Sequence, residues 1–271
     1  MTKKVWLITG TSKGFGNIWA KAALERGDYV AATARDIDSL AGLKDQYGDA
    51  LLPLSLNVDS REDCFRAVEE VVNKFGSIDI LINNAGFGHF GTVEAITEEE
   101  ARAQIDTNLF GSLWMIQAVL PIMRKQNSGH IIQVSSIGGV TSFPNLGIYH
   151  ASKWAVEGLC ESLRQEVASF NINVTLVEPS GYSTEWGTTS AKHSKVIEAY
   201  QPLLDLVKER QGSHKGANPE NTANAILSLV DSPTPPLRLF LGKLPFQIIE
   251  PTYQKRLAEW KLWQSVSENA E

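Results

Sequence analysis

Short apolar runs alternate with longer amphipathic stretches along most of this 271-residue chain. The runs with the length of a strand are 4–9, 29–34, 50–56, 79–83, 129–135, 173–178 and 237–242. Near-continuous apolar runs of this kind are typical of strands that are buried on both faces of a sheet. Their alternation with helices predicts parallel strands joined by right-handed crossovers. We therefore predict a doubly wound α/β fold with a seven-stranded parallel sheet and helices on both faces.

Three helix starts can be predicted from capping patterns. Ser60-x-x-Asp63 and Thr97-x-x-Glu100 have the spacing of a capping box, and Asn218-Pro219 has a capping side chain followed by a proline suited to the first helical position. The longest helical stretches are expected at 97–124 and 149–171. In an open parallel sheet, ligands bind beyond the carboxyl ends of the strands, so we expect the functional residues there.

A glycine-rich turn follows the first predicted strand. Gly10, Gly14 and Gly16 lie between that strand and a helical pattern over 17–26. Glycines let the backbone turn sharply and approach a phosphate closely, and the helix N-terminus offers unpaired N–H groups. The alternative is an ordinary tight β–α turn. The strand, turn and helix together favour a dinucleotide site.

A tyrosine and a lysine have the spacing needed to act together. Tyr149 and Lys153 stand four residues apart, which places them on one helix face. A phenol titrates near pH ~10, and a nearby ammonium is expected to lower that pKa toward a useful range. Ser136 lies upstream at the end of a predicted strand and could hold the oxygen atom that the phenol serves. By itself, a Tyr-x-x-x-Lys pair is weak evidence for catalysis.

In this order along the chain, the motifs resemble those of the short-chain dehydrogenase/reductase family. They are Thr9-Gly-x-x-x-Gly14-x-Gly16, Asn83-Asn84-Ala85-Gly86, Asn108, Ser136 and Tyr149-x-x-x-Lys153. The resemblance extends over nearly the whole chain and implies a Rossmann-type fold. It also implies an oxidoreductase that interconverts a carbonyl and an alcohol with a nicotinamide cofactor.

The resemblance assigns roles to individual residues. Tyr149 becomes the general acid or base, Lys153 assists it, and Ser136 donates to the substrate oxygen. Asn108 is expected to hold a water that links Lys153 to solvent. The residues expected to contact the cofactor are Gly10, Ser12, Lys13, Gly14, Phe15, Gly16, Arg35, Asn57, Val58, Asn84, Ala85, Gly86, Tyr149, Lys153, Pro179 and Thr184.

Two basic residues favour NADP(H) over NAD(H). Arg35 follows the end of the second predicted strand, and Lys13 within the glycine turn can reach the same pocket. An arginine near this point accommodates the 2′-phosphate of NADP, whereas an acidic residue accepts the ribose hydroxyl of NAD. Asp36 would favour NAD if the strand extended one residue further than predicted.

Two positions depart from the family pattern. Asn57 replaces the usual aspartate beside the adenine. Ser180 replaces the glycine that usually follows Pro179, which leaves the backbone path here open.

Composition narrows the environment and the partners. The formal net charge is −6, which argues against nucleic acid or an anionic membrane as the main partner. Cys64 and Cys160 are the only cysteines, and without metal-ligand spacing they predict a reduced, cytoplasmic protein with no metal site. No apolar stretch approaches the ~20 residues of a membrane span. The length fits one domain over 1–271, with a substrate lid implied by the resemblance at about 185–215.

Aromatic residues in the loops after the strands point to the substrate. They are Phe87, Phe90, Phe143, Tyr182 and Trp186. Such side chains suit a pocket for a small apolar ketone, aldehyde or alcohol, although they could also simply pack the loops onto the core.

The two longest predicted helices carry more apolar residues than one core face needs. The residues in excess are Trp114, Met115, Trp154 and Leu159. In the family these helices often form the subunit interface, so we expect a homodimer or homotetramer. Trp260 and Trp263 in the tail are suited to an interface or to a lid.

Two other functions are compatible with parts of the sequence. Gly10-x-Ser12-x-Gly14 also matches the nucleophile turn of hydrolases. A hydrolase of this kind would not require Gly16. No acid and histidine that could complete its catalytic set stand out later in the chain. The second alternative is a non-catalytic NADP-binding redox sensor, since fold does not fix function. The presence of the complete tyrosine, lysine and serine set disfavours it.

Overall fold

The computed structural model describes residues 3–184, 186, 190–212 and 216–271. Its main sheet has seven parallel strands in the order β3-β2-β1-β4-β6-β7-β9. The strands are β1 (Val5–Ile8), β2 (Tyr29–Ala34), β3 (Leu51–Ser55), β4 (Ile80–Asn83), β6 (Gly129–Val134), β7 (Ile172–Pro179) and β9 (Arg238–Leu241). Every strand predicted from the apolar runs is present, within one residue at each end. The predicted doubly wound, Rossmann-type α/β fold is therefore confirmed.

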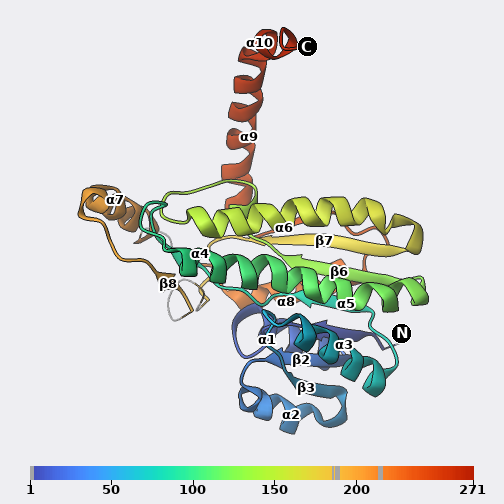
Figure 1. Cartoon of the computed structure of the whole chain (residues 1–271). Helices are drawn as coiled ribbons and strands as arrows, with labels where there is room; N and C mark the ends of the chain where they lie inside the picture. The colour runs from blue at the N-terminus through green and yellow to red at the C-terminus, as the bar shows by residue number, and fades with distance from the viewer. Residues whose placement is uncertain (1–2, 185, 187–189, 213–215) are drawn as a thin grey trace.

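Helices cover both faces of this sheet (Figure 1). One face packs against α3 (Arg61–Phe75), α5 (Gly111–Gln126) and α6 (Gly147–Glu166). The other packs against α1 (Gly14–Glu25), α2 (Ala41–Tyr47) and α8 (Thr222–Asp231). Side chains alternate between the faces along each strand, so in β1 Leu7 joins the first core and Trp6 the second.

The predicted helix starts have the expected caps. The Ser60 side chain accepts from the Asp63 amide, and Thr97 with Glu100 forms a reciprocal capping box. The Asn218 side chain accepts from the Glu220 amide at the start of a short 3₁₀ turn before α8. Pro53 within β3 costs no pairing on its outer side, because β3 is an edge strand.

The predicted helix over 97–124 is not uniform. It comprises α4 (Glu98–Ile105), a π-helical turn over Asp106–Phe110, and α5. The side chain of Asn108 in this turn forms hydrogen bonds with distant segments of the chain. The expectation that Met115 adds to an exposed apolar face is wrong, because Met115 is fully buried in the core. Trp114 and Leu159 are half-buried against the same core, and only Trp154 is exposed, at 39%.

A second, two-stranded sheet was not predicted. It pairs β5 (His89–Phe90) in parallel with β8 (Lys192–His193). The sheet joins the loop after β4 to the segment after β7, and α7 (Gln201–Gly212) follows it. Each strand is too short to give an alternating pattern in the sequence.

The C-terminal helix α9 (Leu244–Leu262) projects away from the sheet layers, and α10 (Gln264–Glu268) lies at its far end (Figure 1). Arg256 attaches the helix to the body of the protein. Its guanidinium donates to the Val140 carbonyl at 3.0 Å and lies 4.9 Å from the Trp154 ring centroid. Within the described residues, no helix is long and apolar enough to cross a membrane.

Candidate active site

The candidate residues gather at the carboxyl edge of the sheet. The glycine turn follows β1, Arg35 follows β2, and Asn57 follows β3. The segment 84–86 follows β4, Ser136 follows β6, and Pro179 ends β7. The predicted positions therefore lie together at the carboxyl ends of neighbouring strands. Open α/β folds bind their ligands at this end of the sheet.

Close backbone approaches require glycine in the turn after β1. Gly10 and Gly14 have φ of 69° and 61°, which favours glycine. A Cβ on Gly16 would lie 2.4 Å from the Gly10 carbonyl oxygen and 2.6 Å from Asn84 Nδ2. The Asn84 amide donates to the carbonyls of Thr9 and Gly10, at 2.9 Å each. The turn is thus tied to the neighbouring strand, and the start of α1 is left open to an anion.

The end of β2 bears on the choice of dinucleotide. The strand stops at Ala34, so Arg35 and Asp36 both lie beyond it and are exposed. The Asp36 carboxylate accepts from the Asp38 amide at 3.1 Å and caps a short 3₁₀ turn. The strand extension that would have favoured NAD does not occur. Lys13 is exposed at the N-cap of α1.

A cavity of about 300 Å³ lies between the start of α1 and the segment after β7. Gly14, Asn17 and Ile18 line one side, and Ser183 and Thr184 line the other. Thr184 thus lines the same cavity as Gly14 of the glycine turn. Ser180, in the place of the usual glycine, is buried, and Gly181 adopts the left-handed conformation with φ of 62°.

Tyr149, Lys153 and Ser136 come from two adjacent segments. Tyr149 and Lys153 are buried on one face of α6, at 5% and 6% exposure. The Lys153 ammonium donates to the Val134 carbonyl at 2.9 Å and lies 5.8 Å from the Tyr149 ring centroid. The Ser136 hydroxyl accepts from the Gly138 amide at 3.0 Å. The three residues are brought together around the Tyr149 phenol.

Burial dominates the electrostatics of this site. It raises the pKa of Tyr149 to about 12, and a hydrogen bond with Ser136 acts in the opposite direction. It lowers the pKa of Lys153 to about 8, and the negative charge of Glu157 opposes that shift. The expectation of a lowered pKa for Tyr149 is therefore wrong for this geometry. Its physical reason is that desolvation of the buried phenol outweighs the hydrogen bond with Ser136.

Asn108 lies in the π-helical turn and is 1% exposed. Its Oδ1 accepts from the Phe87 amide at 3.1 Å. Its Nδ2 donates to the Phe87 carbonyl at 3.0 Å and to the Ser152 hydroxyl at 3.1 Å. The side chain therefore joins the loop after β4 to the helix that carries Tyr149 and Lys153.

The cofactor candidates that follow β3 and β4 are Asn57, Val58, Ala85 and Gly86. Asn57 is exposed and accepts from the Asp59 amide at 3.3 Å, whereas Val58 is buried. A Cβ on Gly86 would lie 3.0 Å from Asn108 Oδ1, and Ala85 packs against the core.

The aromatic loop residues divide into two groups. Trp186 lies over Tyr149, with ring centroids 4.9 Å apart, and Phe90 is 5.6 Å from Trp186. Tyr182 instead packs edge-on against Phe15 at 5.3 Å, beside the glycine turn. Tyr182 therefore lies with the glycine turn and Trp186 with the phenol of Tyr149.

Two supporting groups were missed from the sequence. The His150 ring bonds the Gly138 carbonyl through Nδ1 at 2.8 Å and accepts from the Phe143 amide through Nε2 at 2.9 Å, which holds the loop that carries Ser136. The Ser194 hydroxyl donates to Glu100 at 2.7 Å and lies 2.8 Å from His89 Nε2. These contacts fasten β8 to α4 and β5. The position of His150 beside Tyr149 was the one available signal.

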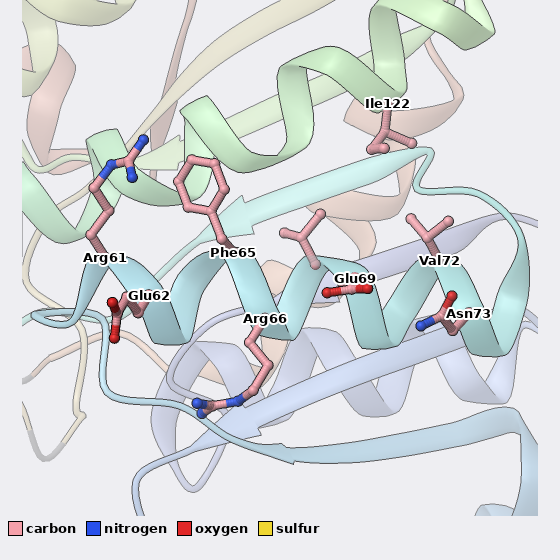
Figure 2. A pocket seen from close by; sticks show the side chains of 9 residues that line it. Arg61, Glu62, Phe65, Arg66, Glu69, Val72, Asn73 and Ile122 are labelled. Atoms are coloured by element: carbon pink, nitrogen blue, oxygen red, sulfur yellow. The ribbon is translucent and has the colours of Figure 1, made fainter.

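A larger hollow of about 600 Å³ lies elsewhere, along α3 and against α5. Figure 2 shows Phe65 and Ile122 at this hollow, with Arg61 at the start of α3. None of the candidate catalytic or cofactor residues lines it. The Arg61 guanidinium lies 4.2 Å from the Phe65 ring centroid and 5.7 Å from that of Trp114.

Comparison with known sequences identifies the family. The sequence profile of the short chain dehydrogenase family matches residues 4–195. Oxidoreductase BOA17 of Botryotinia fuckeliana is 42% identical over 243 residues, which cover 88% of this chain and 89% of that protein. The 3-ketodihydrosphingosine reductase of Bacteroides thetaiotaomicron is 36% identical over 250 residues, 90% of each chain.

Solved structures agree with this assignment. A short-chain dehydrogenase from Streptomyces avermitilis superposes with a TM-score of 0.93 at 35% identity, covering 100% of this chain and 99% of that one. A 3-ketoacyl-(acyl-carrier-protein) reductase from Brucella melitensis in complex with NADH has a TM-score of 0.75 at 28% identity, over 88% and 96% of the two chains. The closed form of a serine dehydrogenase with NADP+ has a TM-score of 0.78 at 27% identity, over 89% and 95%. The chain is a member of the short-chain dehydrogenase/reductase family of oxidoreductases.

Proposed function

We propose that this oxidoreductase interconverts a ketone or aldehyde and the corresponding alcohol, using NADP(H). The observation that carries the proposal is the convergence of Tyr149, Lys153 and Ser136 at the sheet edge that also carries the glycine turn. Gly16 packs directly against the Gly10 carbonyl and Asn84, with no room for a side chain, and this tight turn suits the close approach of a dinucleotide phosphate to the start of α1.

The bound cofactor would supply the hydride, and the chain's own groups would supply the proton and the electrostatics. Tyr149, with a pKa of about 12, is protonated at neutral pH, which is the form that carbonyl reduction needs. Its proton goes to the carbonyl oxygen as that oxygen becomes an alcohol. The Lys153 ammonium, fixed by the Val134 carbonyl, stabilises the phenolate left behind. Ser136 donates to the substrate oxygen, where negative charge develops.

Preference for NADP(H) follows from the charges around the adenosine ribose. Arg35 and Lys13 are both exposed near the end of β2 and the glycine turn. Asp36 is occupied by the cap that it provides to the Asp38 amide. A 2′-phosphate therefore finds positive charge, while a ribose hydroxyl finds no strand-end carboxylate.

Asn108 is proposed to support the relay of protons to Lys153. Its side chain fixes the π-helical turn against Phe87 and Ser152, and this turn lies beside α6. A carbonyl freed from regular helical bonding in such a turn can hold a water. Asn57 and Val58 are proposed to border the adenine.

The substrate is proposed to be apolar. Trp186 lies over Tyr149, and Phe90 packs against Trp186. An aromatic cover of this kind favours apolar carbonyl compounds. The relative that is a 3-ketodihydrosphingosine reductase makes a long-chain ketone a reasonable member of the test panel. We regard 1–271 as one domain with a substrate lid at about 185–215, of which residues 185, 187–189 and 213–215 lie outside the described residues.

We also propose a cytoplasmic homo-oligomer. Exposed apolar side chains follow one face of α9, at Phe246, Tyr253, Leu257 and Trp260. Along the described chain, nothing packs over Leu257 and Trp260, which are 59% and 66% exposed. A second copy of the chain would cover this stripe. The mixed charges along α9, with Glu250 and Glu259 against Lys255 and Lys261, suit pairing with an identical helix better than attraction to an anionic membrane.

The decisive experiment follows NADPH oxidation with a panel of apolar ketones and aldehydes, using wild type and Tyr149→Phe. We expect kcat/KM to fall by ~10²–10⁴-fold in the variant, with NADPH affinity unchanged. Tyr253→Phe, on the exposed face of α9, is the matched control and should keep full activity.

Full activity in Tyr149→Phe would contradict the assigned proton donor. Tight NADPH binding without turnover of any carbonyl would instead favour a redox sensor.

A further inference from the structure

Two buried carboxylates lie directly behind the candidate catalytic lysine. Glu157 follows Lys153 by one turn of α6, and Glu178 lies near the end of β7. They are 4% and 0% exposed. The mechanism above uses neither. A pair of buried acids next to a catalytic group is unusual enough to require a role, because an unpaired buried charge is costly.

One cation serves both acids. Arg238 on β9 lies with Nε 2.9 Å from Glu157 Oε2 and 3.6 Å from Glu178 Oε1. Its Nη2 is 3.0 Å from Glu161 at the surface, so part of its charge is already engaged. With both buried carboxylates ionised, the pair would carry one negative charge more than the arginine provides. Like charges held this close cannot both remain ionised in a buried site.

Unpartnered oxygen atoms identify where a proton belongs. The Ser135 side chain forms a hydrogen bond with Glu157, whereas neither carboxylate oxygen of Glu178 has a hydrogen-bond donor among the described residues. A proton on Glu178 would make it a donor toward Glu157. Burial and the charge of Glu157 raise the pKa of Glu178 to about 9, in agreement with a protonated Glu178. Burial raises the pKa of Glu157 as well, but the hydrogen bonds from Ser135 and Arg238 oppose that shift. Glu157 also has the shorter contact with Arg238, so it is the acid suited to keep the negative charge.

We propose that Glu157 and Glu178 share one proton, and that the remaining charge on Glu157 makes it a positioning residue that keeps the Lys153 ammonium charged. The catalytic part of this inference rests on the proposed function. Lys153 is buried, and burial favours its neutral amine. The carboxylate one helical turn away offsets that tendency. Lys153 can then stabilise the Tyr149 phenolate at the pH where the enzyme works.

Charged and titratable groups surround Glu157 on α6, β7 and β9, and the segment after β6 adds the Ser135 hydroxyl. The charged and titratable groups are Lys153, Cys160 and Glu161 on α6, Glu178 on β7 and Arg238 on β9. Burial and the charge of Glu157 raise the pKa of the Cys160 thiol to about 12, so Cys160 stays neutral near pH 7. Glu157 is therefore the anion from which Lys153 gains its support.

The test compares Glu157→Gln with Glu178→Gln in the pH profile of kcat/KM for carbonyl reduction. Glu157→Gln removes the anion, so Lys153 should lose its proton at lower pH. We expect the alkaline limb of the profile to move down by about one pH unit, the scale of a partly buried charge pair. Glu178→Gln keeps a neutral donor to Glu157 and should leave the limb within about 0.3 unit of wild type.

Two outcomes would overturn the proposal: an unmoved limb in Glu157→Gln, or equal shifts in the two variants. If Glu157→Gln does not fold, Glu157→Asp keeps the charge, and its limb should stay closer to wild type than one unit. A shift of a full unit in Glu157→Asp would also count against the proposal.

A second measurement does not depend on turnover. In protein labelled with ¹³C at the glutamate carboxyl carbon, Glu178 should give the signal of a neutral acid at pH 7, lost in Glu178→Gln. An ionised Glu178 at pH 7 would refute the shared proton. Absence of carbonyl reduction with a neutral Glu178 would instead refute the proposed function and leave the shared proton standing.

Discussion

At the scale of single residues, Gly16 is a position where the backbone leaves no room for a side chain. A methyl group there would lie 2.4 Å from the Gly10 carbonyl oxygen and 2.6 Å from Asn84 Nδ2, and both belong to the tie between β1 and β4. We expect Gly16→Ala to weaken NADPH binding by at least about tenfold, equivalent to ~1.4 kcal/mol, as measured by fluorescence titration.

Gly42→Ala is the matched control for this substitution. Gly42 lies in α2 with open space around its Cα, so alanine should raise helix stability by up to ~1 kcal/mol without changing NADPH affinity. Equal affinity in wild type and Gly16→Ala would show that the cradle is not the cofactor site.

His130 makes stability depend on pH. It is 4% exposed in β6, and its Nε2 lies 2.9 Å from Thr175 Oγ1. Burial, with a smaller effect of Lys4, lowers the pKa of His130 from 6.5 to about 4. The unfolded chain therefore takes up the proton first as pH falls. The stability from neutral His130 is fully present above pH ~6.5 and is lost as pH falls toward ~4.

Urea unfolding of wild type and His130→Gln at pH 7 and pH 5 measures this contribution. Between these values the free energy of unfolding of wild type should fall by about 2 kcal/mol more than that of the variant. The other histidines are common to both proteins and serve as the internal control. Parallel losses in the two proteins would mean that His130 titrates normally in the fold.

At the scale of elements, the lid contact between Gly88 and Trp186 can be tested directly. A Cβ on Gly88 would lie 2.4 Å from Trp186 Cζ2, so Gly88→Ala should push the indole away from Tyr149. We expect KM for apolar ketones to rise about fivefold, on the order of 1 kcal/mol of lost apolar contact. NADPH affinity should not change.

Gly158→Ala is the control for the lid variant, because Gly158 on α6 has open space around it. Its steady-state constants should match those of wild type. If Gly88→Ala leaves KM unchanged, Trp186 does not border the substrate.

The strands could be predicted because each is a local apolar run whose burial is visible in its own residues. The π-helical turn could not, because it depends on bonds from Asn108 to Phe87 and Ser152, 21 and 44 positions away. The β5–β8 sheet was missed for a similar reason, since it joins Phe90 to His193 across the fold. An element that forms only through contacts with a distant part of the chain is hard to recognise from its local sequence pattern.

The residues of the candidate site could be predicted, but their electrostatics could not. The order of the motifs brought Tyr149 and Lys153 to notice, and the structure brings them together as expected. The direction of the Tyr149 pKa shift was wrong, because its burial is set by tertiary packing that includes Trp186. The cluster of Glu157, Glu178 and Arg238 was not predicted from the sequence, because these residues lie on three different elements and meet only in the folded chain.

At the scale of the whole molecule, the projecting helix α9 predicts self-association. Leu257 and Trp260 are exposed on one face, while Lys255 lies about 200° around the helix from Leu257, at ~100° per residue. Light scattering should give the mass of a dimer or tetramer for wild type. The double variant Leu257→Gln, Trp260→Gln should shift the mass toward the monomer.

Lys255→Gln, on the opposite face of the same helix, should leave the oligomer intact. A monomeric wild type would remove the proposed assembly. An unchanged mass in the double variant would place the contact elsewhere, such as at the hollow lined by Phe65 and Ile122 (Figure 2).

The central claim is that this site moves a hydride between NADPH and a carbonyl carbon. The most direct measurement incubates the enzyme with NADPH deuterated at the transferable C4 position and the best ketone of the panel. Mass spectrometry of the product then locates the label. The account predicts one deuterium on the carbinol carbon of the alcohol for each NADPH oxidised. NADPH oxidation that leaves no deuterium in the alcohol, or no oxidation with any carbonyl, would contradict it.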